Sequence, residues 1–173
     1  ITQHIRTYSA AQFPELPALA ARFGLQLTLG AWLDKDWASN EREITAALSL
    51  AAQHTNVKRL IVGNEAVLEQ SLTPAQLITH LQRVRANTKL PVSTAEPWHV
   101  WIKHPELATQ VDFITIHLLP YWEGVGLATA VDESLERMAR VRARFPGKEI
   151  VIGEIGYPSS GDRLFVCYDA GLL

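Results

Sequence analysis

Uninterrupted apolar runs that stop at polar residues recur along the chain. Residues 60–62 are all aliphatic and lead into Asn64 and Glu65, while the aliphatic residues 150–152 lead into Glu154. Such runs predict strands that are buried on both faces, as in a parallel sheet. A carboxylate at the end of a buried strand does not belong in a core. The two glutamates are therefore the first candidates for a functional cleft.

Strands and helices alternate along most of the chain. The apolar patterns predict strands at residues 2–8, 25–29, 58–63, 91–95, 111–119 and 149–152. They predict helices at residues 14–23, 40–54, from Thr73 to about 84, 101–108 and 128–145. A short strand within residues 164–173 is a further option.

Local signals indicate where several helices begin, end and face. Asn40 followed by Glu43 predicts a capping box, and Thr73 starts another capping signal. Gly24 is expected to end its helix in a left-handed conformation. The last helix is expected to turn one apolar stripe toward the core, formed by Val131, Leu135, Met138 and Val141.

Strict β–α alternation predicts a parallel sheet with right-handed crossovers. A Rossmann-type sheet would carry a glycine-rich phosphate loop after its first strand, and none follows residues 2–8. A (β/α)8 barrel places its site on the C-terminal rim of all strands, which matches the even spread of polar residues here. A full barrel needs about 250 residues. We therefore expect one partial catalytic domain over residues 1–173: an α/β, incomplete (β/α)8 TIM barrel of about six units, without its first strand and last unit.

Composition narrows the class of function. Hydrophobic residues make up 47% of the 173 residues and charged residues 20%, which provides a core and argues against disorder. The formal net charge of −2, without a basic run, argues against a nucleic-acid partner. No apolar run approaches the roughly 20 residues of a membrane span. The single cysteine, Cys167, excludes an internal disulfide.

Two glutamates at one barrel rim suit glycoside hydrolysis. One carboxyl group protonates the leaving oxygen while the other attacks the anomeric carbon, which gives a covalent glycosyl-enzyme. This retaining reaction needs the carboxyl groups about 5–5.5 Å apart, whereas inversion needs roughly 6.5–9.5 Å. The acid must stay protonated while its partner stays ionised, so their surroundings must differ. Asn64, directly before Glu65, can bind a hydroxyl of the reacting sugar.

Two motifs carry a family resemblance. Residues 61–65 read Ile-Val-Gly-Asn-Glu, and residues 153–161 read Gly-Glu-Ile-Gly-Tyr-Pro-Ser-Ser-Gly. Together they resemble glycoside hydrolase family 17, the β-1,3-glucanase family. Residues 93–98 and 117–124 resemble its bacterial branch, which includes β-1,3-glucan transglycosylases that are often joined to a membrane glycosyltransferase. The resemblance covers nearly the whole chain from Arg6 to Gly161.

The resemblance implies a retaining barrel with Glu65 as acid/base and Glu154 as nucleophile, after the fourth and seventh strands of the complete fold. By the same matching, Tyr121 lies near the nucleophile and Asn64 contacts the sugar at which the bond breaks. The implied substrate is a β-1,3-glucan oligosaccharide or polysaccharide, which places the protein in the periplasm or outside the cell. We expect no cofactor and no metal. Tyr157 departs from the family pattern, which usually has tryptophan there.

Other rim residues are expected to contact the substrate. Trp98 and Trp122 follow strand ends and can stack on sugar faces, whereas Trp101 is expected in the core. Arg6 can face the cleft or pair with Glu96 or another rim carboxylate. His117 is either a hydrogen-bonding rim residue or a buried structural histidine. The predicted substrate contacts are Asn64, Tyr121, Tyr8, Arg6, Glu96, Trp98, His117, Trp122 and Tyr157.

Several functions stay open at this point. Whether water or a sugar hydroxyl takes the glycosyl group from Glu154 separates a hydrolase from a transglycosylase, and the bacterial-branch motifs favour transfer. A truncated barrel that binds carbohydrate without catalysis is the alternative. An aldolase or isomerase is disfavoured, because Lys58, Lys89 and Lys148 lie at N-terminal strand ends, the wrong face for catalysis.

Overall fold

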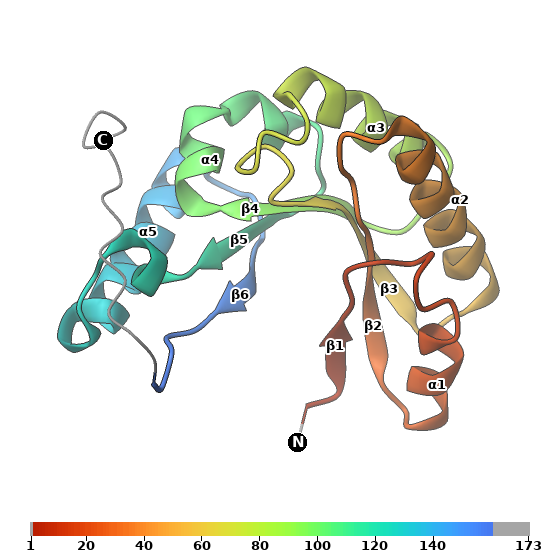
Figure 1. Ribbon diagram of the computed structural model, residues 1–173, viewed down its shortest axis with the longest axis horizontal. Helices are drawn as coiled ribbons and strands as arrows, with labels where there is room; N and C mark the ends of the chain where they lie inside the picture. Colours follow the sequence, from red (N-terminus) through yellow and green to blue (C-terminus); the bar gives the residue numbers. More distant parts are fainter. Residues whose placement is uncertain (1, 161–173) are drawn as a thin grey trace.

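Six parallel strands form one sheet in the computed structural model, which describes residues 2–160. In spatial order they are β1 His4–Arg6, β2 Gln26–Ala31, β3 Val57–Asn64, β4 Val92–Pro97, β5 Ile114–Leu118 and β6 Ile150–Ile155. All neighbouring strands pair in parallel. The sheet bends into a nearly closed barrel (Figure 1), which confirms the predicted partial (β/α)8 architecture. The strand suggested for residues 164–173 lies outside the described residues.

Helices connect the strands along the outer side of the sheet (Figure 1). Those described are α1 Leu16–Arg22, α2 Trp37–Gln53, α3 Pro74–Ala86, α4 Trp98–Lys103 and α5 Ala130–Arg144, with 3-10 turns at Pro105–Thr109, Pro120–Glu123 and Leu127–Thr129. The predicted capping box of α3 is confirmed, because Thr73 and Gln76 exchange side-chain and backbone hydrogen bonds. Gly24 has the predicted positive φ of 66° just after α1.

Helix α2 begins before the predicted start. Its N-cap is Asp36, whose side chain accepts a hydrogen bond from the Ala38 N–H. Asn40 lies inside the helix, fully buried, and bonds the backbone of Asp34. The predicted Asn40–Glu43 capping box was therefore wrong. Both residues are buried polar groups that organise neighbouring loops.

The main core lies between the sheet and its helices. Aliphatic side chains of β3, α3 and β5 make up much of it, including Leu60, Leu81 and Ile114, each no more than 1% exposed. Trp101 is fully buried there, as predicted, and its indole N–H donates to the Thr115 carbonyl oxygen. The packed core holds the strand ends in fixed positions, which a catalytic rim requires.

Helix α5 turns only the second half of its predicted stripe inward, because Met138 packs against the core beside Val141. Val131 and Leu135 are 70% and 54% exposed, while Val141 is fully buried. Arg137 takes an inward position because it lies 3.3 Å from Glu123 and over the ring of Trp98. A polar contact by Arg137 thus takes part of the inward face of α5, while Met138 and Val141 pack on the core. Within residues 2–160, no helix has both the length and the apolar character to cross a membrane.

Candidate active site

The end of β3 places Glu65 through an unusual backbone path. The β3–β4 register shifts between Ile61 and Asn64. Gly63 has a φ of 85°, and Glu65 has a φ of 53°, which is uncommon for a residue with a side chain. The Glu65 N–H donates to the Ala95 carbonyl oxygen on β4 at 2.8 Å. Neighbouring structure therefore holds Glu65 in a conformation of the kind that concentrates at functional sites.

Glu96 on β4 holds the loop that follows Glu65. Its carboxylate accepts hydrogen bonds from the N–H groups of Val67 at 2.9 Å and Leu68 at 3.2 Å. The residue is fully buried, and this burial raises the pKa of Glu96 to about 7, although the backbone donors act in the opposite direction. A direct sugar contact by Glu96 was predicted. The structure corrects this, because the carboxylate is enclosed and bound to the loop backbone.

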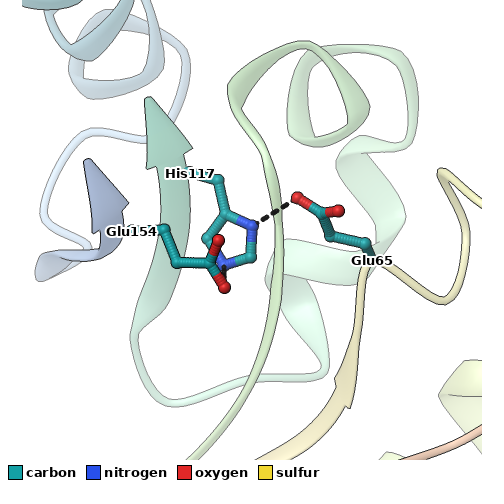
Figure 2. Close-up of side chains that lie close together, drawn as sticks. All are labelled: Glu65, His117 and Glu154. Carbon is teal, nitrogen blue, oxygen red and sulfur yellow. Dashed lines mark hydrogen bonds and ion pairs between the residues drawn. The ribbon is translucent and has the colours of Figure 1, made fainter. Parts of the chain in front are cut away.

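His117 lies between the two candidate glutamates (Figure 2). Its Nδ1 is 2.6 Å from Glu65 Oε1, and its Nε2 is 3.5 Å from Glu154 Oε1. The pairing of β5 with β6 sets His117 opposite Glu154. The histidine side chain is 0% exposed. His117 is therefore both buried and hydrogen-bonded to a rim carboxylate, and its contact with substrate stays a prediction.

Arg6 from β1 completes the cluster. Its Nη1 lies 3.5 Å from Glu154 Oε1 and 3.2 Å from His117 Nε2, and its Nη2 donates to Asn64 Oδ1. The rim carboxylate that Arg6 pairs with is thus Glu154, and not Glu96. Burial lowers the pKa of Arg6, while nearby negative charges raise it, and the group stays a cation.

The contacts of Arg6 decide the tautomer of His117. A guanidinium group only donates hydrogen bonds, so His117 Nε2 must accept and the ring hydrogen must lie on Nδ1. Nδ1–H then donates to Glu65 Oε1. Glu65 Oε2 is left as the oxygen that can carry an acidic proton. His117 therefore orients the Glu65 carboxyl group without taking that proton.

Tyr8 lies on the Glu154 side of the cluster. Its ring lies 4.7 Å from the Arg6 guanidinium carbon, and its hydroxyl hydrogen-bonds Glu154. Partial burial raises the pKa of Tyr8, and the negative charge of Glu154 adds to this effect. Tyr8 therefore stays a neutral hydroxyl that donates a hydrogen bond to the Glu154 carboxylate.

Three aromatic residues that follow β5 and β6 contact one another. Tyr121 contacts Trp122 and Tyr157 edge-on, with ring centroids 5.3 and 5.6 Å apart. Trp122 is 51% exposed, and the Tyr157 hydroxyl donates to the Val125 carbonyl oxygen. These three residues form an aromatic cluster at the rim, as a sugar-contacting surface would require. Their contact with substrate stays a prediction.

Trp98 does not belong to this surface. It is 7% exposed, its indole N–H donates to Glu123, and the guanidinium groups of Arg137 and Arg140 lie over its ring. The predicted stacking of Trp98 on a sugar was wrong. Its ring packs α4 against α5 instead.

The cluster also contains donor types that metals use. One donor atom each from Glu65, His117 and Glu154 lies within 4.8 Å of the others, among residues 2–160. However, these donors already bind one another, and the Arg6 guanidinium contacts two of them. A metal ion there would meet a fixed positive charge. The arrangement suits a pair of carboxyl groups better than a cation site.

Sequence reasoning passed over two residues that shape the site. A Cβ at Gly153 would lie 2.9 Å from Arg6 Nη1 and 2.7 Å from Thr115 Cγ2, so only glycine leaves room there. Glu43 links the loops after β1 and β2, because its carboxylate accepts hydrogen bonds from the Ser9 hydroxyl and the Trp32 N–H. A glycine directly before the nucleophile motif was the available signal for Gly153. Nothing in the local sequence indicated the partners of Glu43.

Comparison with known proteins identifies the family. The family model of the BtgE/BtgC glycoside hydrolase domain matches residues 1–165. The chain belongs to this family. Among curated relatives, it is 23% identical over 167 residues to the "probable beta-glucosidase btgE" of Aspergillus terreus. It is 26% identical over 162 residues to the "probable glucan endo-1,3-beta-glucosidase btgC" of the same fungus. These two matches cover 91% and 85% of this chain but only 30% and 24% of the length of the relatives.

Solved structures support the same placement. A glycoside hydrolase family 17 β-1,3-glucanosyltransferase from Rhizomucor miehei superposes with a TM-score of 0.83 at 29% identity. An active-site mutant of the R. miehei β-1,3-glucanosyltransferase, in complex with laminaritriose, gives a TM-score of 0.84 at 28% identity. Each match covers 94% of this chain and 63% of the solved chain. The resemblance to family 17 is thus confirmed. The named relatives are fungal, and the bacterial branch stays a prediction.

Proposed function

We propose that this glycoside hydrolase domain cleaves β-1,3-glucosidic bonds by double displacement, with Glu65 as acid/base and Glu154 as nucleophile. The observation that carries the proposal is the spacing of these groups. One oxygen of each carboxyl group lies within 4.8 Å of the other, and His117 lies between them. This spacing is close to the roughly 5–5.5 Å of retaining enzymes and below the roughly 6.5–9.5 Å that inversion needs.

The first step forms the glycosyl-enzyme. Glu154 attacks the anomeric carbon, a C–O bond forms to its carboxylate, and the glycosidic C–O bond breaks. Glu65 donates a proton to the leaving oxygen from Oε2, because Oε1 accepts the His117 Nδ1–H. Arg6 and Tyr8 both contact the attacking carboxylate and orient it.

The second step releases the sugar. Glu65, now ionised, takes a proton from the incoming hydroxyl, whose oxygen attacks the anomeric carbon and frees Glu154. Asn64 helps in both steps. Arg6 binds its Oδ1, which turns the amide N–H₂ into the donor for a sugar hydroxyl next to the reacting carbon.

The incoming hydroxyl belongs either to water or to another glucan. We favour transfer to a glucan, since the solved R. miehei relatives are glucanosyltransferases and one of them binds laminaritriose. A polymeric substrate also places the protein in the periplasm or outside the cell. A membrane glycosyltransferase domain in the same parent protein would supply such a polymer.

Product analysis tests the proposal. The chain is incubated with laminarihexaose beside Glu154→Gln, Glu65→Gln and the control Glu69→Gln, which changes an exposed glutamate of the same loop. We expect the wild type and the control to give longer products by mass, and both active-site variants to give none. Glu65→Gln should still form the glycosyl-enzyme from a β-glucoside with an acidic phenol as leaving group, because that departure needs no proton.

Two results would redirect the proposal, and a third would contradict it. Products that are only shorter than the substrate indicate hydrolysis. Binding of laminarihexaose without any product from the wild type favours the alternative of a carbohydrate-binding barrel that does not catalyse. Near-normal turnover by Glu154→Gln contradicts the nucleophile assignment.

A further inference from the structure

Arg137 on α5 is a charged residue inside the helix layer. It is 8% exposed, and its Nη2 lies 3.3 Å from Glu123 Oε2 and 3.8 Å from Glu133 Oε2. Its Nη1 is buried and meets no hydrogen-bond acceptor within residues 2–160. A buried guanidinium with an unused donor costs stability, whereas an apolar side chain could pack there without that cost. Such a cost is expected where a functional site needs the residue.

Glu123 connects Arg137 to the rim of the barrel. It is the last residue of the 3-10 turn Pro120–Glu123, which carries two members of the aromatic cluster. Its Oε2 accepts a hydrogen bond from the Trp98 indole N–H at 3.1 Å and also contacts Arg137. Trp98 and Arg137 belong to α4 and α5, and both are buried. One carboxylate thus fastens the turn to two helices of the packed layer.

A second contact holds the same turn from the β6 side. The Tyr157 hydroxyl donates to the Val125 carbonyl oxygen at 3.0 Å, and the Val125 N–H donates to the Pro120 carbonyl oxygen at 3.0 Å. Gly124 between the two fastenings has a φ of 74°. A turn held at one point can pivot, whereas contacts on two sides fix its direction. The contact of Arg137 with Glu123 therefore helps to set the direction in which Trp122 projects.

This fastening lies on the Glu65 side of the cleft. Trp98 follows β4 directly, and β4 pairs with β3, the strand that leads into Glu65. Burial lowers the pKa of His99, the neighbour of Trp98, while the negative charges of Glu123 and Glu65 both raise it. The two carboxylates therefore lie around one imidazole. In double displacement the leaving sugar departs, and the incoming hydroxyl enters, on the side of the acid/base.

We propose that Arg137 is a positioning residue for the transfer step, which acts through Glu123 to hold the Pro120–Glu123 turn where the incoming sugar binds. It touches no reacting atom. A fixed turn orients a sugar hydroxyl toward the glycosyl-enzyme, whereas water needs no such orientation, so Arg137 favours transfer over hydrolysis. The inference rests on the proposed function, which assigns Glu65 and the glycosyl-enzyme. Its experiment includes readouts that do not depend on turnover.

The test compares Arg137→Met with Arg140→Met. Both guanidinium carbons lie 5.7 Å from the centre of the Trp98 ring, but Arg140 pairs with the exposed Glu136 of the same helix and not with Glu123. Each variant loses one positive charge. Laminarihexaose products are separated by mass. We expect similar total cleavage in both variants, and a ratio of longer to shorter products about fivefold lower in Arg137→Met, because the incoming sugar loses its orientation.

Thermal unfolding and amide hydrogen exchange separate positioning from stability. We expect Arg137→Met to unfold within a few degrees of the control, because the Glu123 side chain is 21% exposed and keeps the Trp98 N–H. Amide exchange of residues 120–125 should become several-fold faster in Arg137→Met but not in Arg140→Met. If Arg137→Met does not fold, Arg137→Met with Glu123→Gln replaces it, since this pair removes both charges and keeps an acceptor for Trp98.

Binding decides the outcome where turnover does not. Laminarihexaose affinity is measured by calorimetry in the Glu154→Gln background, and Arg137→Met should lower it about fivefold relative to Arg140→Met. If the wild type makes longer products, an equal product ratio in the two variants overturns the role of Arg137. If the wild type only hydrolyses or forms no product, equal affinity or equal exchange of residues 120–125 overturns it. An affinity that depends on Arg137 without any wild-type product instead overturns the proposed reaction and leaves the positioning role standing.

Discussion

Nδ1 of His117 lies 2.6 Å from Glu65 Oε1, while Nε2 of the same ring points to Glu154 Oε1 at 3.5 Å. One buried imidazole thus contacts both candidate catalytic carboxyl groups. Because Arg6 donates to Nε2, the ring presents its N–H to Glu65 and not to Glu154. The two glutamates therefore differ in their donors, and this difference is what a pair with separate acid and nucleophile roles requires.

Removing this N–H should slow the proton-dependent step. We expect His117→Ala to lower kcat on laminarihexaose by about 10²-fold, because Glu65 loses the contact that orients its acidic oxygen. His117→Asn keeps a donor near the position of Nδ1 and should recover part of the loss. The measurement is kcat and KM for both variants, together with a substrate whose leaving group needs no protonation. An equal loss in both variants on both substrates would mean that His117 only fills space.

The buried Glu96 should make stability depend on pH. Its pKa is raised from 4.5 to about 7 in the folded chain, so the native state binds more protons than the unfolded state between these values. This contribution is fully present below pH 4.5 and is lost as pH rises through 7, with a total of about 3 kcal/mol. Glu96→Gln should flatten this dependence, as judged by urea unfolding at several pH values between 4.5 and 8.

The negative charge of Glu65 provides a second test of the raised pKa of Glu96. Glu65 adds to the raised pKa, so Glu65→Gln should lower the midpoint of the pH dependence slightly without removing it. Glu69 is exposed, so Glu69→Gln should change neither the midpoint nor the size of the pH dependence. An unchanged slope in Glu96→Gln would show that another group controls stability in this pH range.

A single methyl group at Gly153 should disable the cluster. The Cβ of Gly153→Ala would lie 2.9 Å from Arg6 Nη1 and 2.7 Å from Thr115 Cγ2. We expect Arg6 to move away from Glu154, which should reduce kcat/KM at least about tenfold and destabilise the fold by about 1–3 kcal/mol. Gly156→Ala is the matched control, because its Cβ would meet nothing within 4 Å. Kinetics and thermal unfolding of both variants check this, and equal behaviour of the two would contradict the close approach.

The sequence alone determined the architecture and the position of the two glutamates. Buried strands alternate with helices, and parallel strands place their C-terminal ends on one rim, so the sequence predicts that Glu65 and Glu154 lie at the same rim. Local signals also predicted the Thr73 cap and the Gly24 turn, because their partners lie only a few residues away. Such features depend on short-range chemistry, which can be read from neighbouring residues.

Only the tertiary structure decided which polar groups face the cleft and which hold it together. Glu43 and Glu96 accept hydrogen bonds from backbone N–H groups about 30 residues distant, those of Ala10 and Val67, and no local pattern identifies such partners. Trp98 was mistaken for a sugar contact for the same reason, since Glu123 and Arg137 draw it into the α4–α5 contact. The tautomer of His117 follows from Arg6 on a strand 111 residues away. A side chain's role is set by what surrounds it in space, and that is a property of the folded chain.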